Sequence, residues 1–249
     1  MVLERPKLDG KHILITGGAG GVGRAVARRM VAEGARVLIA DREEADLRAV
    51  VDSLRGGPGA IEAVAGDLSD PGGIAAMFER ADEWLGRLDI LVACAGVGSG
   101  PLMEMDDAGW RYVIETNLAS YVACTRGAIE RIRAAGIRDG MVILVGSISI
   151  HIKAVGESVY NAAKGGVASF AETLRKELMP EHIRVTLIEP GAIGSAMQPY
   201  PEEERARFIE QYEMLPPAEV AEAILFAATR KPGVDVVTLR IEPLIQKIW

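Results

Sequence analysis

The stretch Thr16-Gly17-Gly18-Ala19-Gly20-Gly21-Val22-Gly23 joins the apolar run His12–Ile15 to a helical pattern over Val22–Glu33. Its glycines let the main chain turn tightly and approach a pyrophosphate, while the N–H groups that begin the helix favour an anion. A glycine cluster alone is weak evidence, but between a strand and a helix, early in a βαβ unit, it predicts a dinucleotide site. The alternative is a tight strand-to-helix turn with no ligand. The residues that we expect to contact the cofactor here are Gly17, Gly20, Gly21, Val22 and Gly23.

Two acids farther along bear on which dinucleotide binds. Asp41 lies 20 residues after Gly21, the spacing expected of the acid that accepts hydrogen bonds from the adenosine ribose. A carboxylate there repels a 2′-phosphate, so we predict NAD. Arg42 keeps NADP open as the less favoured cofactor, because an arginine can accommodate that phosphate. Asp67, followed by Leu68, is a candidate for the adenine edge or simply the acid of a turn before a helix.

Short apolar runs alternate with longer helical patterns along nearly the whole chain. Continuous apolar runs are typical of strands covered on both faces. Alternating strands and helices predict one α/β domain over 1–249, a doubly wound parallel sheet of about seven strands with helices on both faces. The predicted strands are His12–Ile15, Arg36–Ala40, Ala60–Ala65, Ile90–Ala93, Met141–Val145, Arg184–Ile188 and Val236–Arg240. The predicted helices are Val22–Glu33, Glu43–Leu54, Pro71–Trp84, Gly109–Ala135, Tyr160–Met179 and Pro217–Ala228.

One stretch, 191–216, breaks this alternation. It contains Pro199-Tyr200-Pro201 and an acidic run, Glu202 to Glu204. We interpret it as a lid over the substrate, with a solvated surface excursion as the alternative.

Composition excludes several classes of function. A net charge of −7 argues against binding nucleic acid or anionic lipid, which requires clustered Lys and Arg. The two cysteines, Cys94 and Cys124, lie in apolar surroundings and read as buried thiols, and the three histidines lack ligand spacing, so we expect no metal. The apolar runs are too short to span a bilayer. We expect a soluble, cytoplasmic protein that acts on a small molecule.

Tyr160 and Lys164 are the candidates for proton chemistry. Four residues apart at the start of a predicted helix, they share one face. An ammonium near a phenol lowers the phenol pKa, and such a tyrosine can exchange a proton with a substrate oxygen. Ser147, 13 residues before Tyr160 and just beyond a predicted strand, lies at the sheet edge where open α/β folds bind ligands.

With these residues in place, the chain resembles the short-chain dehydrogenase/reductase family over essentially its full length. The motifs that carry the resemblance are Thr16-Gly-x-x-x-Gly21-x-Gly23, Ser147 with Tyr160-x-x-x-Lys164, Thr116-Asn117-Leu118, and Pro190-Gly191. The resemblance implies a Rossmann fold and a catalytic set of Asn117, Ser147, Tyr160 and Lys164. In that set Tyr160 is the general acid or base, Lys164 lowers its pKa and binds the nicotinamide ribose, Ser147 polarises the substrate oxygen, and Asn117 holds a water. A locally satisfied helix-kink residue is the alternative for Asn117.

The resemblance also implies further cofactor contacts and shows departures. The nicotinamide side would be contacted by Ala95, Gly96, Pro190, Gly191, Ile193 and Ser195, besides Tyr160 and Lys164. The family's Asn-Asn-Ala-Gly is Ala93-Cys94-Ala95-Gly96 here, which loses a side-chain amide near the cofactor. Ser195 replaces the threonine often found after the Pro-Gly turn, and the common Asp-Gly-Gly near the C-terminus is missing.

The implied function is hydride transfer between NAD(H) and the carbinol or carbonyl carbon of a small alcohol, hydroxy acid or ketone. The alternatives are a catalytically idle NAD-binding regulator or scaffold, and an epimerase that retains its cofactor. Substrate-facing candidates are Met103, Ile150, His151, Lys153, Met197, Tyr200, Tyr212 and Met214. Family members often assemble through the helices predicted here at 109–135 and 160–179, so we expect a homotetramer or homodimer.

Overall fold

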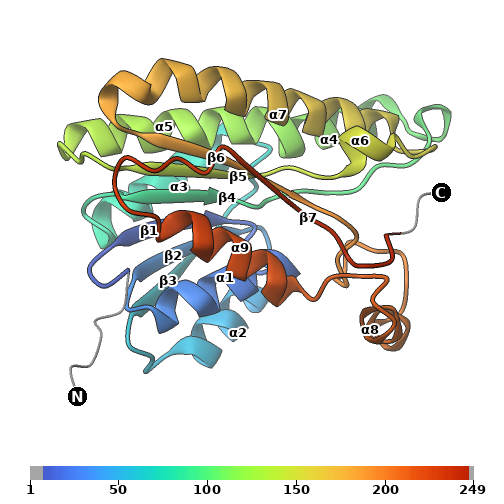
Figure 1. The fold of residues 1–249 in the computed structure, drawn as a ribbon, viewed down its shortest axis with the longest axis horizontal. Coiled ribbons are helices and arrows are strands. Elements are labelled where there is room, and N and C mark those ends of the chain that lie inside the picture. The colour runs from blue at the N-terminus through green and yellow to red at the C-terminus, as the bar shows by residue number, and fades with distance from the viewer. Residues whose placement is uncertain (1–7, 247–249) are drawn as a thin grey trace.

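The computed structural model describes residues 8–246. They fold around one seven-stranded parallel sheet whose strand order is β3-β2-β1-β4-β5-β6-β7 (Figure 1). This order, with helices on both faces, confirms the predicted doubly wound fold. The strands are β1 His12–Thr16, β2 Arg36–Asp41, β3 Ala60–Ala65, β4 Ile90–Ala93, β5 Met141–Val145, β6 Arg184–Pro190 and β7 Thr238–Ile241. All residues of β4, β5 and β6 are buried. For β4 and β5, which are continuous apolar runs, this is the burial expected of strands inside such a sheet.

The helices form two layers that cover the sheet (Figure 1). On one face lie α1 Gly21–Ala32, α2 Glu44–Leu54 and α9 Pro217–Ala228, and on the other α3 Pro71–Trp84, α5 Ser120–Ala134 and α7 Ser158–Leu178. The helix α3 begins where the sequence indicates, because the Asp70 carboxylate accepts hydrogen bonds from the N–H groups of Gly72 and Gly73.

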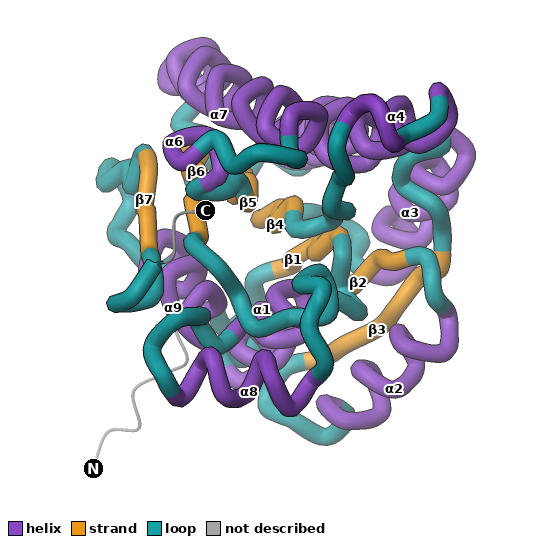
Figure 2. Tube along the Cα trace, turned by 90° about the vertical axis from the view of Figure 1, so that its right-hand side faces the viewer, coloured by secondary structure: helices purple, strands orange, loops and turns teal. Residues whose placement is uncertain are grey.

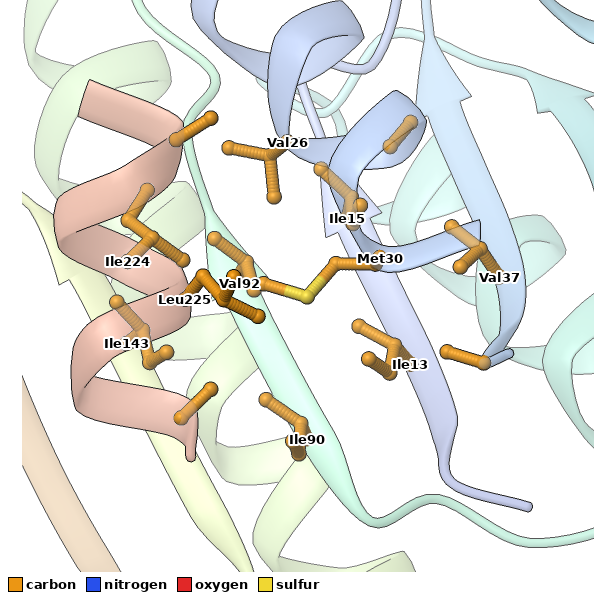
Figure 3. Close-up of a cluster of buried hydrophobic side chains, with 14 of the residues drawn as sticks. Ile13, Ile15, Val26, Met30, Val37, Ile90, Val92, Ile143, Ile224 and Leu225 are labelled. Carbon is orange, nitrogen blue, oxygen red and sulfur yellow. The ribbon is translucent and has the colours of Figure 1, made fainter. Parts of the chain in front are cut away.

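The core under α1 fixes the glycine stretch against the sheet. Figure 3 shows Met30 of α1 and Leu225 of α9 pointing toward Val92 of β4, with Ile13 and Ile15 of β1 beside them. These side chains are at most 7% exposed. Burial of a single side chain of this size contributes about 1.5–3 kcal/mol, so this packing holds α1 against the sheet.

The predicted helix over 109–135 is three segments. They are α4 Asp107–Ile114, the π-helical turn η2 Glu115–Ala119, and α5. The predicted start at 109 was wrong, because the Asp106 side chain caps α4 and the helix begins two residues earlier. The prediction of a single continuous helix was also wrong, because apolar periodicity does not distinguish an inserted π turn from continuous α-helix.

The stretch 191–216 contains a helix that the sequence did not predict. This helix, α8 Glu202–Glu210, has no buried residue, so it lacks the apolar stripe by which surface helices are recognised. A bridge between Ile193 and Leu215 closes the base of the excursion. Figure 2 shows the chain after β6 running past α1 before it enters α8.

The remaining differences concern element ends and short turns. Pairing with neighbours extends β1, β2 and β6 by one or two residues, and β7 starts two residues late because its ladder with β6 begins at Leu187 and Thr238. The short helix α6 Ser149–Ile152 and the 3-10 turns η1 Leu102–Glu104 and η3 Met179–Glu181 were not predicted. No helix in the described part of the chain is long and apolar enough to cross a membrane.

Candidate active site

The glycine stretch forms a cradle that only glycine permits. A Cβ on Gly17 would lie 2.7 Å from the Ala95 nitrogen, and one on Gly23 would collide with the Gly17 carbonyl oxygen. Gly17 also has a φ of +69°, which side chains disfavour. The first α1 residue to donate an N–H to a preceding carbonyl is Arg24, which bonds to Gly20. The N–H groups of Gly21, Val22 and Gly23 therefore stand at the positive helix end, where a pyrophosphate fits.

Asp41, at the end of β2, braces this cradle. Its Oδ2 accepts the Ala19 N–H at 3.0 Å and its Oδ1 accepts the Arg42 N–H at 2.7 Å. The Arg42 side chain turns to Glu43, at 3.0 Å, and donates to the Tyr112 hydroxyl at 2.9 Å. The carboxylate thus lies beside the glycine cradle, while the guanidinium is held at its exposed rim.

Other predicted cofactor residues lie around the same strand ends. The Asp67 carboxylate accepts the Ser69 N–H and hydroxyl at 2.9 and 2.7 Å, so it builds the turn before α3, the alternative weighed for it. Leu68 is buried in the core. The Thr16 hydroxyl accepts the N–H groups of Cys94 and Ala95. Sequence reasoning did not assign Thr16 this role, which ties β1 to the loop that holds Ala95 and Gly96.

The chain after β6 returns to the glycine cradle. Gly191 donates its N–H to the Ile241 carbonyl at 2.7 Å, following Pro190 at the end of β6. Ser195 packs so close to Gly21 that a Cβ on that glycine would come within 2.9 Å of the Ser195 Cβ. A Cβ on Gly96 would lie 3.7 Å from the Met197 methyl carbon. Residues 191–197, including Ile193 in the bridge to Leu215, therefore pass over the site.

Ser147 and Tyr160 meet at the carboxyl end of β5. Ser147 follows β5 and its Oγ accepts the Ser149 N–H at 3.1 Å. Tyr160 is the third residue of α7, and its side chain lies close enough to that of Ser147 for the serine to lower the pKa of the phenol. The predicted pair of hydroxyl groups is thus brought together at the sheet edge near the cradle.

Lys164 lies one turn along α7 from Tyr160 and is buried. Its Nζ donates to the Tyr121 hydroxyl and to the Val145 carbonyl oxygen, each at 3.0 Å. It stands 5.9 Å from the centre of the Tyr160 ring. Tyr121, which sequence reasoning missed, follows Asn117 by four residues and so shares its helix face, the one signal that pointed to it.

The expected lowering of the Tyr160 pKa by Lys164 is not what this geometry gives. Burial raises the pKa of Tyr160 to about 12, against an opposing effect of the hydrogen bond from Ser147. Burial lowers the pKa of Lys164 to about 7, because an ammonium loses its hydration there. The hydrogen bonds of the lysine go to Tyr121 and Val145 rather than to the Tyr160 phenol.

Asn117 lies in η2, where its side chain makes three hydrogen bonds to the main chain. Its Nδ2 donates to the carbonyl oxygens of Val97 and Val113, at 2.9 and 3.0 Å, and its Oδ1 accepts the Val97 N–H at 3.2 Å. This is the locally satisfied arrangement weighed for Asn117. The side chain thus fixes the loop after β4 against the π turn.

Two further pairs of residues complete the surroundings. Burial raises the pKa of both the Cys94 and Cys124 thiols to about 12, which keeps them protonated and unreactive.

His151 of α6 lies 3.0 Å from the buried Glu189 carboxylate of β6, a pairing that the sequence did not indicate. Among residues 8–246, the His, Cys, Asp and Glu side chains form no group of three or more that could hold a metal.

Comparisons with known proteins agree with this geometry. The family model described as short chain dehydrogenase matches residues 11–206. Cis-4-hydroxycyclohexanecarboxylate dehydrogenase of Sinomonas cyclohexanicum is 35% identical, covering 87% of this chain and 88% of its own. The 3-oxoacyl-[acyl-carrier-protein] reductase FabG of Escherichia coli K12 is 31% identical, covering 89% and 91%.

Solved structures share the whole architecture. A dehydrogenase/reductase from Sinorhizobium meliloti 1021 superposes with a TM-score of 0.85 at 28% identity, covering 96% of each chain. A metagenomic short-chain oxidoreductase in complex with NADP gives a TM-score of 0.81 at 29% identity, covering 95% of this chain and 98% of that one. Because the family model spans most of the chain and the fold agrees from end to end, this protein belongs to the short-chain dehydrogenase/reductase family.

Proposed function

We propose that this oxidoreductase transfers a hydride between a nicotinamide dinucleotide and the carbinol or carbonyl carbon of a small alcohol, hydroxy acid or ketone. The observation that carries the proposal is the meeting of the Ser147 and Tyr160 side chains at the strand ends beside the glycine cradle, with Lys164 one turn behind. Such a reaction needs a site that binds the dinucleotide, a proton donor beside the substrate oxygen and a positive charge near both. The glycine cradle, the Tyr160 phenol and the Lys164 ammonium can provide these three.

Each residue has a distinct task in this proposal. A bound nicotinamide supplies or accepts the hydride. The Tyr160 phenol, whose raised pKa keeps it protonated at neutral pH, gives its proton to the substrate oxygen during reduction and becomes the phenolate. In the oxidation direction it is the phenolate form that accepts the proton of the alcohol. Ser147 donates a hydrogen bond to the same oxygen. Lys164 binds the nicotinamide ribose, and the side chain of Asn117 holds the loop that carries Gly96 and Val97.

NAD is the cofactor that we propose. The Asp41 carboxylate lies beside the cradle and would face the ribose hydroxyls, where a 2′-phosphate would be repelled. NADP remains the second candidate, because Arg42 is next to Asp41 and the metagenomic relative is in complex with NADP. Against NADP, the Arg42 guanidinium is already engaged by Glu43 and Tyr112.

The substrate proposal starts from the relatives' own names. One relative is named for dehydrogenation of a ring-borne secondary alcohol with a carboxylate, and another for reduction of a 3-oxoacyl group. Probes for this chain are therefore cis-4-hydroxycyclohexanecarboxylate, cyclohexanol, and a 3-oxoacyl thioester. Absorbance at 340 nm with NAD⁺ or NADH, and separately with the NADP forms, measures turnover.

This measurement separates the proposal from its alternatives. Stoichiometric formation or loss of NADH with one of the probes supports a dehydrogenase. Tight NADH binding without net turnover of any alcohol or ketone favours the idle regulator, and conversion of substrate with no net change at 340 nm favours the epimerase. Failure to bind either dinucleotide would contradict the assignment of the glycine cradle.

We also propose a homo-oligomer. A groove of about 820 Å³ between α3 and α5 is lined by Ile74, Phe78, Leu118 and Val122, among others, and Val122 is 41% exposed. The groove lies on the outer face of α5, one of the two helices for which assembly was expected, and a second copy would cover it.

A further inference from the structure

Tyr121 contacts the proposed catalytic lysine, yet the proposed mechanism gives it no task. Lys164 Nζ donates to the Tyr121 hydroxyl and to the Val145 carbonyl oxygen, both at 3.0 Å. The Tyr121 hydroxyl donates to the same carbonyl, also at 3.0 Å. The three polar atoms thus form a closed triangle, and Tyr121 is only 1% exposed.

A structural role for the phenol does not require this triangle. A buried tyrosine hydroxyl needs one acceptor, and the Val145 carbonyl already provides it. The bond from Lys164 is additional, and it serves the lysine, because a buried ammonium needs acceptors to replace its lost hydration. The Tyr121 ring adds to this effect, since Lys164 Nζ lies 4.5 Å from its centre, closer than to the Tyr160 ring at 5.9 Å.

The triangle also limits which way the ammonium can point. An ammonium carries three N–H donors, and Tyr121 and Val145 occupy two of them. The one that remains is available to a ligand. Gly96 also borders the amine, since a Cβ on it would lie 3.8 Å from Lys164 Nζ, and glycine there leaves room for a ligand.

We propose that Tyr121 is a positioning residue: with the Val145 carbonyl it holds the Lys164 ammonium so that its remaining N–H meets the nicotinamide ribose. This inference rests on the proposed function, because it assigns Lys164 to the dinucleotide. The expected consequence is that the Tyr121 hydroxyl supports the charged state of the lysine and, through it, cofactor affinity.

The titratable neighbours of Lys164 allow this consequence to be measured. The titratable groups that face it are Cys94 beyond β4, Tyr121 on α5 and Tyr160 on α7. The pKa of the Cys94 thiol and that of Tyr160 are about 12, and burial raises that of Tyr121 well above its usual value. Between pH 6 and 9 the lysine, with its pKa near 7, is the member of this group that changes charge.

The sign of the effect follows from linkage. Ribose hydroxyls accept hydrogen bonds from the ammonium, so binding favours the charged lysine and takes up a proton. NADH affinity is then constant below the pKa of Lys164 in the free enzyme and falls as the pH rises above it. The pH at which the fall begins is called the break. Tyr121→Phe removes one acceptor of the ammonium, which lowers the lysine pKa and moves this break to lower pH.

The experiment is a fluorescence titration with NADH between pH 6 and 9, on wild type, Tyr121→Phe and a control. In Tyr121→Phe we expect the break to move down by about one pH unit, which makes NADH binding about tenfold weaker at pH 8. The control is Thr125→Val, one turn along α5. It removes a hydroxyl that is equally buried but has no partner in the described part of the chain, so its break should match wild type.

Two further variants separate positioning from packing. Tyr121→Gln returns both an acceptor and a donor, and should recover part of the affinity; it also serves should Tyr121→Phe fold poorly. In a Lys164→Met background, Tyr121→Phe should change NADH affinity no further, since the hydroxyl would have no ammonium to hold. A wild-type break in Tyr121→Phe, or an undiminished effect without Lys164, would overturn the proposal. If the wild-type protein did not bind NADH at all, the proposed function itself would be contradicted.

Discussion

At the scale of single residues, the Asp41 carboxylate combines two tasks. It accepts N–H groups from Ala19 and Arg42, so it shapes the glycine cradle, and its charge faces the region proposed for the adenosine ribose. A test of cofactor choice must keep the first task while removing the second.

Asp41→Asn comes nearest to that requirement, because its amide oxygen still accepts the Ala19 N–H but carries no charge, and only the bond from the Arg42 N–H is given up. We expect the ratio of NADP to NAD affinity to rise by about tenfold or more, since the repulsion of a 2′-phosphate is gone. Fluorescence titrations with NADH and NADPH measure the ratio. Asp46→Asn, in the first turn of α2, is the control, and an unchanged ratio in Asp41→Asn would mean that this acid does not select the cofactor.

The sequence predicted the residues of the site better than their contacts. Ser147 and Tyr160 were expected to lie together and they do, because strand ends and helix spacing bring them to one edge. The partners of Lys164 could not be predicted, since Tyr121 and Val145 come from elements 43 and 19 residues away along the chain. The same holds for Asn117, whose side chain donates a hydrogen bond to the Val97 carbonyl oxygen in the loop after β4.

At the scale of elements, the cradle depends on glycine where the chain packs against itself. A Cβ on Gly23 would collide with the Gly17 carbonyl oxygen, and no flexible side chain can move aside to relieve that contact. The turn must open before α1 can accept the extra atom.

Gly23→Ala is therefore expected to reduce NADH affinity by at least about tenfold and to lower the melting temperature, because the N–H groups that begin α1 are displaced. Titration with NADH and a thermal melt measure the two effects. Gly100→Ala is the matched control, since a Cβ on that loop glycine meets no atom within 4 Å. Wild-type affinity in Gly23→Ala would show that the cradle is not the dinucleotide site.

Elements with a strong apolar pattern or a cap were predictable, and those without were not. The bounds of α3 follow from Asp70 and Pro71, and β4 and β5 from their unbroken apolar runs. The π turn η2 was hidden because its insertion preserves a helical appearance in the sequence. The helix α8 was missed because its residues pack against no core.

At the scale of the whole molecule, the parallel sheet brings the cradle, Ser147 and Tyr160 to one edge, while the apolar groove between α3 and α5 lies elsewhere. The overall order of strands and helices was predictable from their alternation. Assembly with other copies was not, since it depends on which helix faces stay uncovered after folding.

Val122→Asp tests that assembly. A carboxylate on the outer face of α5, in the groove, would be costly to bury against a second copy, so we expect a smaller assembly than wild type by light scattering after size-exclusion chromatography. Val155→Asp, at a fully exposed position, should leave the assembly unchanged. An identical mass for wild type and Val122→Asp would place any interface elsewhere.

We propose that Tyr160 transfers the proton while the glycine cradle binds the dinucleotide, and a comparison of wild type with Tyr160→Phe separates these two roles. Wild type and Tyr160→Phe are titrated with NADH and then assayed at 340 nm with the best substrate of the probe set. We predict that NADH affinity stays within about threefold, while turnover falls by at least about a hundredfold, the usual contribution of a positioned acid or base. Turnover by Tyr160→Phe at the wild-type rate would contradict the account.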